Sequence, residues 1–159
     1  MITFGKTTEE AASAPFLLKT QELEGAGISF TVALPVFGEA GSAVIAGTDR
    51  KIHDLLRKCT PISPDYENAY EILFEEYVFH MTRDESYASP DPSEFRRGDY
   101  FLLFDQSWLL DHLSHFVEVG IVDAYHPKGY QHYGIYCQNH VIDIIATKAP
   151  MIRKVSIES

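Results

Sequence analysis

Two short segments near the C-terminal end, residues 130–136 and 141–145, constrain the fold of this chain more than any other feature. Both have strand length and β-type residues, and only a few polar residues separate them. With residues 138–139 as a two-residue turn, Gly134 lies opposite Asp143, because turn length sets the register of a hairpin. The two segments therefore predict an antiparallel hairpin in which the side chains on each face are specified.

One face of this hairpin would carry a histidine and a carboxylate. His132 and Asp143 are diagonal neighbours in this register, roughly 7–8 Å apart at the backbone and within reach through their side chains. Gly134 has no side chain and leaves room between them. A carboxylate that binds one ring nitrogen leaves the other nitrogen as a base. A three-residue turn would instead move Asp143 to the other face.

The remainder of the chain predicts an α+β fold in one domain of residues 1–159. Apolar residues recur at helical spacing over residues 48–59, and a capping serine followed by proline begins a second helix over residues 63–81. Residues 28–34 alternate as a strand does, and residues 100–104 form a nearly continuous apolar strand. We therefore expect a helix-rich N-terminal half packed on an antiparallel sheet from the C-terminal half.

The charge of the chain limits its partners. A formal net charge of −10, from 13 Lys+Arg and 23 Asp+Glu, argues against nucleic acid and anionic membranes and suits a basic protein. No window approaches the roughly 20 apolar residues that cross a bilayer. No secretory signal is evident, so we expect no transmembrane segment and a cytoplasmic location.

The sequence predicts neither a cofactor nor a metal centre. Cys59 and Cys137 are far apart and form neither a disulfide framework nor a paired metal-ligand spacing, and there is no glycine-rich phosphate loop. His112 and His115 lie three residues apart on a short helix that Ser107 would cap. Whether these two histidines share an ion is left open by the sequence.

Three segments together resemble a known family. They read Phe95-Arg96-Arg97-Gly98-Asp99-Tyr100, Gly129-Tyr130-Gln131-His132-Tyr133-Gly134-Ile135-Tyr136 and Val141-Ile142-Asp143. They resemble the lecithin:retinol acyltransferase (LRAT-like) family and, more distantly, bacterial cell-wall amidohydrolases of the same papain-like superfamily. The resemblance covers residues 95–145, about a third of the chain. It implies a papain-like fold, with His132 as the catalytic histidine and Asp143 at the position of its polar orienter.

The resemblance also implies a cysteine nucleophile. In the amidohydrolase order the cysteine precedes the Gly-Asp pair, and Cys59 lies at about that distance before it. Cys137 alternates away from His132 and would point to the opposite face. In this hypothesis Cys59 attacks an ester or amide of a small-molecule or peptide substrate, while His132 acts as the base and Asp143 orients it. An inactive relative would instead bind a ligand on the His132 face without turnover.

A competing hypothesis belongs to a different class of protein. The small size, the acidic charge and the incomplete catalytic motif also fit a cytosolic inhibitor, such as an immunity protein that neutralises a basic toxin. This hypothesis predicts tight binding to a basic protein partner, at a rate that falls as ionic strength rises.

Overall fold

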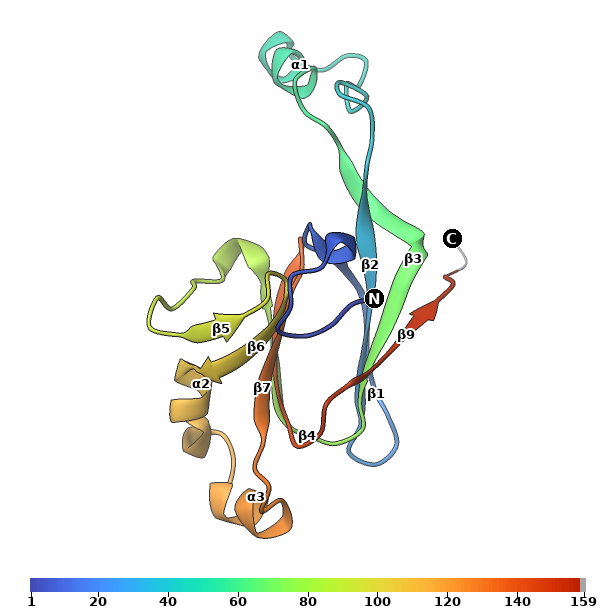
Figure 1. The fold of residues 1–159 in the computed structure, drawn as a ribbon. Helices are drawn as coiled ribbons and strands as arrows, with labels where there is room; N and C mark the ends of the chain where they lie inside the picture. Colours follow the sequence, from blue (N-terminus) through green and yellow to red (C-terminus); the bar gives the residue numbers. More distant parts are fainter. Residues whose placement is uncertain (158–159) are drawn as a thin grey trace.

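Two antiparallel β-sheets lie face to face in the computed structural model, which describes residues 1–157 (Figure 1). One sheet has the strand order β1-β2-β3-β9 and the other has the order β4-β8-β7-β6-β5. The strands are β1 (Phe16–Glu22), β2 (Ile28–Phe37), β3 (Ile62–Phe74), β4 (Tyr77–Asp84), β5 (Phe95–Arg97), β6 (Phe101–Gln106), β7 (Gln131–Tyr136), β8 (His140–Ala146) and β9 (Met151–Val155). Only two residues separate β3 from β4, so the chain passes directly from one sheet to the other.

Helices in the described chain are short and lie outside the sheets. They are α1 (Arg50–Leu56), α2 (Trp108–Asp111) and α3 (Val119–Tyr125), with 3-10 turns at Glu9–Ala11, Glu85–Tyr87 and Leu113–His115. Within residues 1–157, no helix has the length and apolar character needed to span a bilayer.

The main core fills the space between the two sheets. The alternation of β7 directs Tyr133 and Ile135 into this core and leaves His132 and Gly134 on the outer face. Buried apolar side chains from both sheets meet there: Ile28, Phe30, Val32, Ile72, Phe74, Phe101, Ile135, Ile142 and Ile144. Each such side chain contributes roughly 1.5–3 kcal/mol through burial. Because the core covers the inner face of the five-stranded sheet, a functional site on this sheet must lie on its outer face.

The expectation of an α+β fold with a helix-rich N-terminal half is wrong. Residues 63–81, predicted as a helix, form most of β3 and the first part of β4, and β3 pairs along its length with β2. The physical reason is that these residues also follow the two-residue alternation of a strand, in addition to the helical spacing. Ile72 and Phe74 alternate with less buried residues, and this alternation places both in the core. Pro64 does not begin a helix but pairs with Pro35 in the β2–β3 ribbon.

The helix predicted over residues 48–59 is present as α1, but it packs on no core. Asp49 caps it and accepts a 2.9 Å hydrogen bond from the Lys51 amide. Its apolar side chains are nevertheless open to solvent, with Leu55 at 66% exposure. The helix lies at the tip of a ribbon formed by the ends of β2 and β3 (Figure 1). Residues 38–61, which form this tip, are called the arm below.

Two segments cover parts of the outer face of the five-stranded sheet. At one end α2 and the following 3-10 turn pack Leu109 and Leu113 against Ile145 of β8. The loop over residues 85–94 faces the strands across pockets described below. Between these covers, the sheet presents its polar side chains.

Candidate functional site

A chain of four polar side chains crosses the outer face of the five-stranded sheet. His132 Nε2 on β7 lies 3.0 Å from Asp143 Oδ1 on β8. The other carboxylate oxygen, Asp143 Oδ2, accepts a 2.6 Å hydrogen bond from Arg83 Nη2 on β4. On the opposite side of the imidazole, Nδ1 lies 2.7 Å from Ser107 Oγ at the start of α2. Three strands and one helix are thereby joined through their side chains.

The hairpin register predicted from the sequence is confirmed. Gly134 pairs with Asp143, and the Cys137 amide donates a 2.8 Å hydrogen bond to the His140 carbonyl across a two-residue turn. His132 and Asp143 therefore share a face and meet, as expected. Their catalytic roles stay predictions.

The hydrogen bonds among Ser107, His132 and Asp143 are buried, and they satisfy both ring nitrogens of His132. Ser107 and His132 are each 1% exposed and Asp143 is 3% exposed, whereas Arg83 reaches solvent. Because a carboxylate can only accept, His132 donates from Nε2, and in the uncharged ring Nδ1 then accepts from the Ser107 hydroxyl. Ser107 Oγ in turn accepts a 3.1 Å bond from the Leu110 amide. Satisfying these buried groups avoids the desolvation cost that each would otherwise impose.

An aromatic neighbour stacks on the His132 imidazole and fixes the orientation of its ring. Phe104 on β6 pairs with His132, and the two rings stack with centroids 3.9 Å apart and planes 7° apart. Gly134 makes this possible, since a Cβ atom there would lie 2.9 Å from the Phe104 ring. The space that the sequence predicted beside Gly134 is thus occupied by Phe104. The ring orientation of His132 is fixed by stacking as well as by hydrogen bonds.

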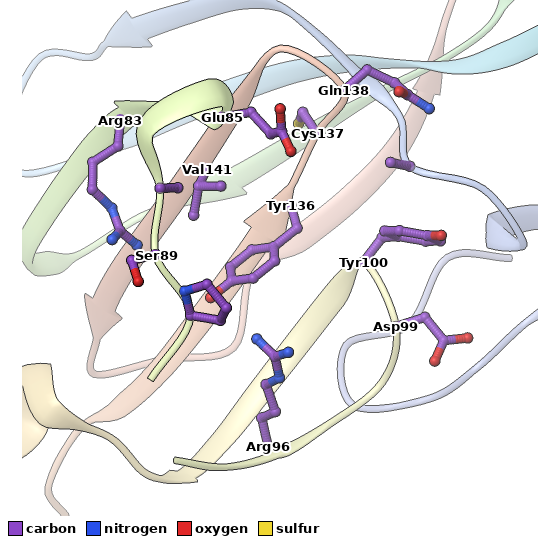
Figure 2. Close-up of a pocket in the computed structure, with 13 residues that line it drawn as sticks. Arg83, Glu85, Ser89, Arg96, Asp99, Tyr100, Tyr136, Cys137, Gln138 and Val141 are labelled. Atoms are coloured by element: carbon purple, nitrogen blue, oxygen red, sulfur yellow. The ribbon is translucent and has the colours of Figure 1, made fainter. Parts of the chain in front are cut away.

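Two adjoining pockets open beside the polar chain. The smaller, of about 230 Å³, borders both His132 and Asp143. The larger, of about 410 Å³, extends toward the β7–β8 turn and is drawn in Figure 2. The two pockets share three lining residues, Arg83, Ser89 and Tyr136. A molecule in the larger pocket would therefore lie beside Arg83, at one end of the row of four polar side chains.

Three titratable groups that line the pockets have raised pKa values: Tyr136, Glu94 and Cys137. Burial raises the pKa of the Tyr136 phenol to about 12, and the Asp143 carboxylate acts in the same direction. Tyr136 is thus an uncharged hydroxyl at neutral pH, with the Arg96 guanidinium 5.4 Å above its ring. Burial also raises the pKa of the Glu94 carboxyl group, partly opposed by the Trp108 amide. The smaller pocket therefore holds a carboxyl group that protonates more readily than an exposed one.

Neither cysteine lies with His132. Cys59 is exposed on the arm, with Sγ 3.3 Å from the Leu55 carbonyl, and the arm projects away from the sheets (Figure 1). Cys137 packs in the main core, away from His132 as the alternation predicted, and also borders one end of the larger pocket. Burial raises the pKa of the Cys137 thiol to about 12. Of the residues proposed from the sequence, the structure brings together His132 and Asp143 but not Cys59.

We expect one reactive and one unreactive thiol. In dilute native protein at about pH 8, Cys59 should react freely with an aromatic disulfide reagent. Cys137 should react only on unfolding, because the thiolate is the reactive form and its formation is suppressed in the core. His132→Ala should leave the Cys59 rate unchanged. Peptide mapping of the labelled cysteines checks this, and a slower Cys59 in that variant would reveal a Cys-His pair absent from the structure.

The two histidines considered as metal ligands form hydrogen bonds with backbone carbonyl groups. His112 donates from Nδ1 to the Trp108 carbonyl at 2.9 Å, and His115 donates from Nδ1 to the His112 carbonyl at 3.2 Å. Across residues 1–157, no group of three or more His, Cys, Asp or Glu side chains is arranged to hold an ion.

Reasoning from the sequence assigned no functional role to Arg96, which lines the larger pocket, and it also missed Ser107, Arg83 and Glu94. Ser107 was recognised only as a helix cap, a role that it does fill. Arg83 lies on β4, which could not be placed beside β8 while residues 63–81 were assigned to a helix. Glu94 lies in the loop that covers the sheet and has no local signal. A strand assignment for residues 77–84 would have put Arg83 near Asp143.

Comparison with protein-family models, curated proteins and solved structures found no match for this chain. The resemblance to the LRAT-like family, and the thiol chemistry that it implies, therefore remain predictions from the sequence.

Proposed function

We propose that this protein binds a small anionic molecule, with a carboxylate or phosphate group, in the larger pocket. One observation carries the proposal: the guanidinium groups of Arg83 and Arg96 line the same pocket with unused donors. Arg83 gives Nη2 to Asp143, while its buried Nε has no hydrogen-bond partner. Among residues 1–157, Arg96 has no carboxylate partner and lies over the Tyr136 ring. Two positive charges on the wall of one pocket favour an anionic ligand there.

The chemistry of the lining residues supports an anion in particular. A guanidinium matches the two oxygens of a carboxylate or phosphate, and a charge-assisted hydrogen bond of this kind is stronger than a neutral one. Figure 2 shows Arg83 and Arg96 approaching the hydroxyl end of Tyr136 from opposite sides. Two carboxylates, Glu85 and Asp99, also line the pocket, one toward Cys137 and the other beyond Tyr100. Both are directed away from the space between the arginines.

In this proposal the buried polar chain positions Arg83 and does not react. Asp143 holds the guanidinium, His132 holds Asp143, and Ser107 completes the hydrogen bonding of the imidazole. Acyl transfer would require a nucleophile that a substrate can reach. Ser107 is 1% exposed and is among the lining residues of neither pocket. The geometry thus favours the ligand-binding form of the hypothesis over the catalytic one.

Calorimetric titration with benzoate and phenyl phosphate, with benzyl alcohol as the uncharged control, tests the proposal. Both anions should bind and benzyl alcohol should not. Arg96→Gln should weaken anion binding at least about tenfold, since one charge-assisted contact is lost. Arg97→Gln is the matched control: Arg97 is adjacent on β5, but its guanidinium is paired with Asp105 at 2.9 and 3.0 Å, and it does not line the pocket.

Two results would overturn the proposal. One is the absence of binding by either anion up to about 10 mM, which corresponds to less than about 3 kcal/mol of affinity. The other is an equal loss of binding in both arginine variants. Covalent labelling of Ser107 by a fluorophosphonate probe would instead establish a nucleophile and favour a hydrolase that uses serine. The inhibitor hypothesis makes a separate prediction, salt-sensitive binding to a basic protein, that does not depend on Arg96.

A further inference from the structure

The arm presents apolar side chains to solvent instead of to the core. Helix α1 contains no buried residue. Large apolar side chains on the arm and at its base are exposed: Val36, Phe37, Ile45, Ile52, Leu55 and Ile62. Figure 1 shows this part of the chain projecting from the sheets on the ends of β2 and β3. Clustered exposed apolar side chains of this kind mark an interaction surface.

The arm has a defined shape. Its two sides are joined by backbone hydrogen bonds, from the Gly38 amide to the Pro61 carbonyl and from the Gly41 amide to the Cys59 carbonyl, both 2.9 Å long. Gly41 has a φ of +79°, and a Cβ atom there would lie 3.2 Å from the Arg57 carbonyl oxygen. The apolar side chains are therefore carried on a hydrogen-bonded scaffold that needs little ordering before it can bind.

The charge of the arm has the opposite sign to that of the chain. Residues 38–61 contain four cationic side chains, Arg50, Lys51, Arg57 and Lys58, and three carboxylates, Glu39, Asp49 and Asp54, so the arm has a net charge of +1, with its cations gathered in and directly after α1. The chain as a whole has a net charge of −10. A basic surface with an apolar centre fits an acidic partner surface that also exposes apolar groups.

The same chain contains an acidic stretch of sequence that runs from the end of β4 through β5, β6 and α2 to α3. Residues 84–123, called the acidic region, hold nine carboxylates and two arginines. The carboxylates are Asp84, Glu85, Asp91, Glu94, Asp99, Asp105, Asp111, Glu118 and Asp123. The same region exposes large apolar side chains: Tyr87, Phe95, Trp108, Phe116 and Ile121. In Figure 1 the arm projects away from α2 and α3, so it does not meet this region within its own chain.

We propose that the arm of one copy docks on the acidic region of a second copy, and that the exchange is reciprocal. Opposite charges then face each other, and the exposed apolar groups of both surfaces are covered. Reciprocal docking uses the same pair of surfaces twice and closes the assembly as a two-fold dimer. A one-way contact would leave a free arm at one end and a free acidic region at the other, and would propagate into filaments. The acidic region includes residues that line the larger pocket, among them Glu85, Arg96 and Asp99, so a docked arm would lie beside the ligand site.

Sedimentation of the wild-type protein over a concentration series tests the dimer. We expect a monomer–dimer equilibrium that weakens as salt rises from about 0.05 M to about 0.5 M, because the Debye length shortens. Leu55→Asp should raise the dimer dissociation constant at least about tenfold without changing the melting temperature of the dilute protein. Met151→Asp is the control, since Met151 is an exposed apolar residue on β9 outside both surfaces. A monomer at all concentrations, or equal effects of the two variants, would overturn the proposal.

The native Cys59 thiol can report where the arm docks. Dilute protein is labelled at Cys59 with a maleimide photo-crosslinker, and isotopically light and heavy chains are then mixed, concentrated and irradiated. Crosslinks between a light and a heavy chain that map to residues 84–123 are the expected result. Crosslinks that map to residues 36–62 of the second copy would show arm-to-arm pairing and overturn docking on the acidic region.

Discussion

Replacement of Asp143 by alanine is expected to lower the free energy of unfolding by about 2–4 kcal/mol. The carboxylate is the acceptor for both His132 and Arg83. Without it, the His132 Nε2 hydrogen is enclosed with no acceptor in a ring that Phe104 holds in place. Arg83 contributes less to the loss, because it is 38% exposed and water can replace part of the ion pair. Urea denaturation followed by far-ultraviolet circular dichroism measures the change.

Two further variants measure separately how much the His132–Asp143 and His132–Ser107 hydrogen bonds contribute to stability. Asp143→Asn keeps an oxygen that can accept from His132 and should cost less than alanine. Ser107→Ala removes one hydrogen bond and the cap of α2, and should cost about 1–2 kcal/mol. An Asp143→Ala variant as stable as the wild-type protein would show that water replaces the carboxylate as the acceptor for His132, contrary to the 1% exposure of that histidine.

Replacement of Gly98 by alanine is expected to cost about 2–4 kcal/mol, from backbone strain together with a steric clash. Gly98 has a φ of +88°, and its Cβ atom would lie 2.5 Å from the Phe101 carbonyl oxygen. That oxygen also accepts a 2.8 Å hydrogen bond from the Gly5 amide. Relief of the clash would therefore displace either β6 or the N-terminal segment. Thermal and urea unfolding measure the loss.

Gly120→Ala provides the matched control for Gly98→Ala. Gly120 lies in α3, and a Cβ atom there meets nothing within 4 Å. Alanine should be neutral or stabilise the protein by up to about 1 kcal/mol, because it restricts the unfolded chain and favours helix. Equal stability changes in the two variants would mean that the backbone at Gly98 adapts without cost.

Local features of the fold were predictable and non-local ones were not. The β7–β8 hairpin is specified by its own turn and alternation, so the sequence placed Gly134 opposite Asp143 correctly. Residues 63–81 satisfy helical spacing and strand alternation at once. Pairing of β3 with β2 and β9 decides between the two, and β9 lies about 80 residues further along the chain. No window of sequence contains that information.

The same distinction applies to the site. His132 and Asp143 are 11 residues apart and were found together, whereas Ser107 is 25 residues from His132 and Arg83 is 60 residues from Asp143. The proposed nucleophile Cys59 was chosen from its position in the order of a family motif. Its location on the arm follows from β2 and β3 forming a ribbon, which the predicted helix over residues 63–81 precluded.

The strand order also has a consequence for how the chain folds during synthesis. β4 is made early, but its partner β8 and the final strand β9 of the other sheet are made last. Neither sheet can be completed until residues 131–155 have been synthesised. Until then β4 presents an unpaired edge, which is the type of exposed surface that nascent chains bury late and that chaperones protect. The Arg83–Asp143 contact therefore cannot form until β8 has been synthesised.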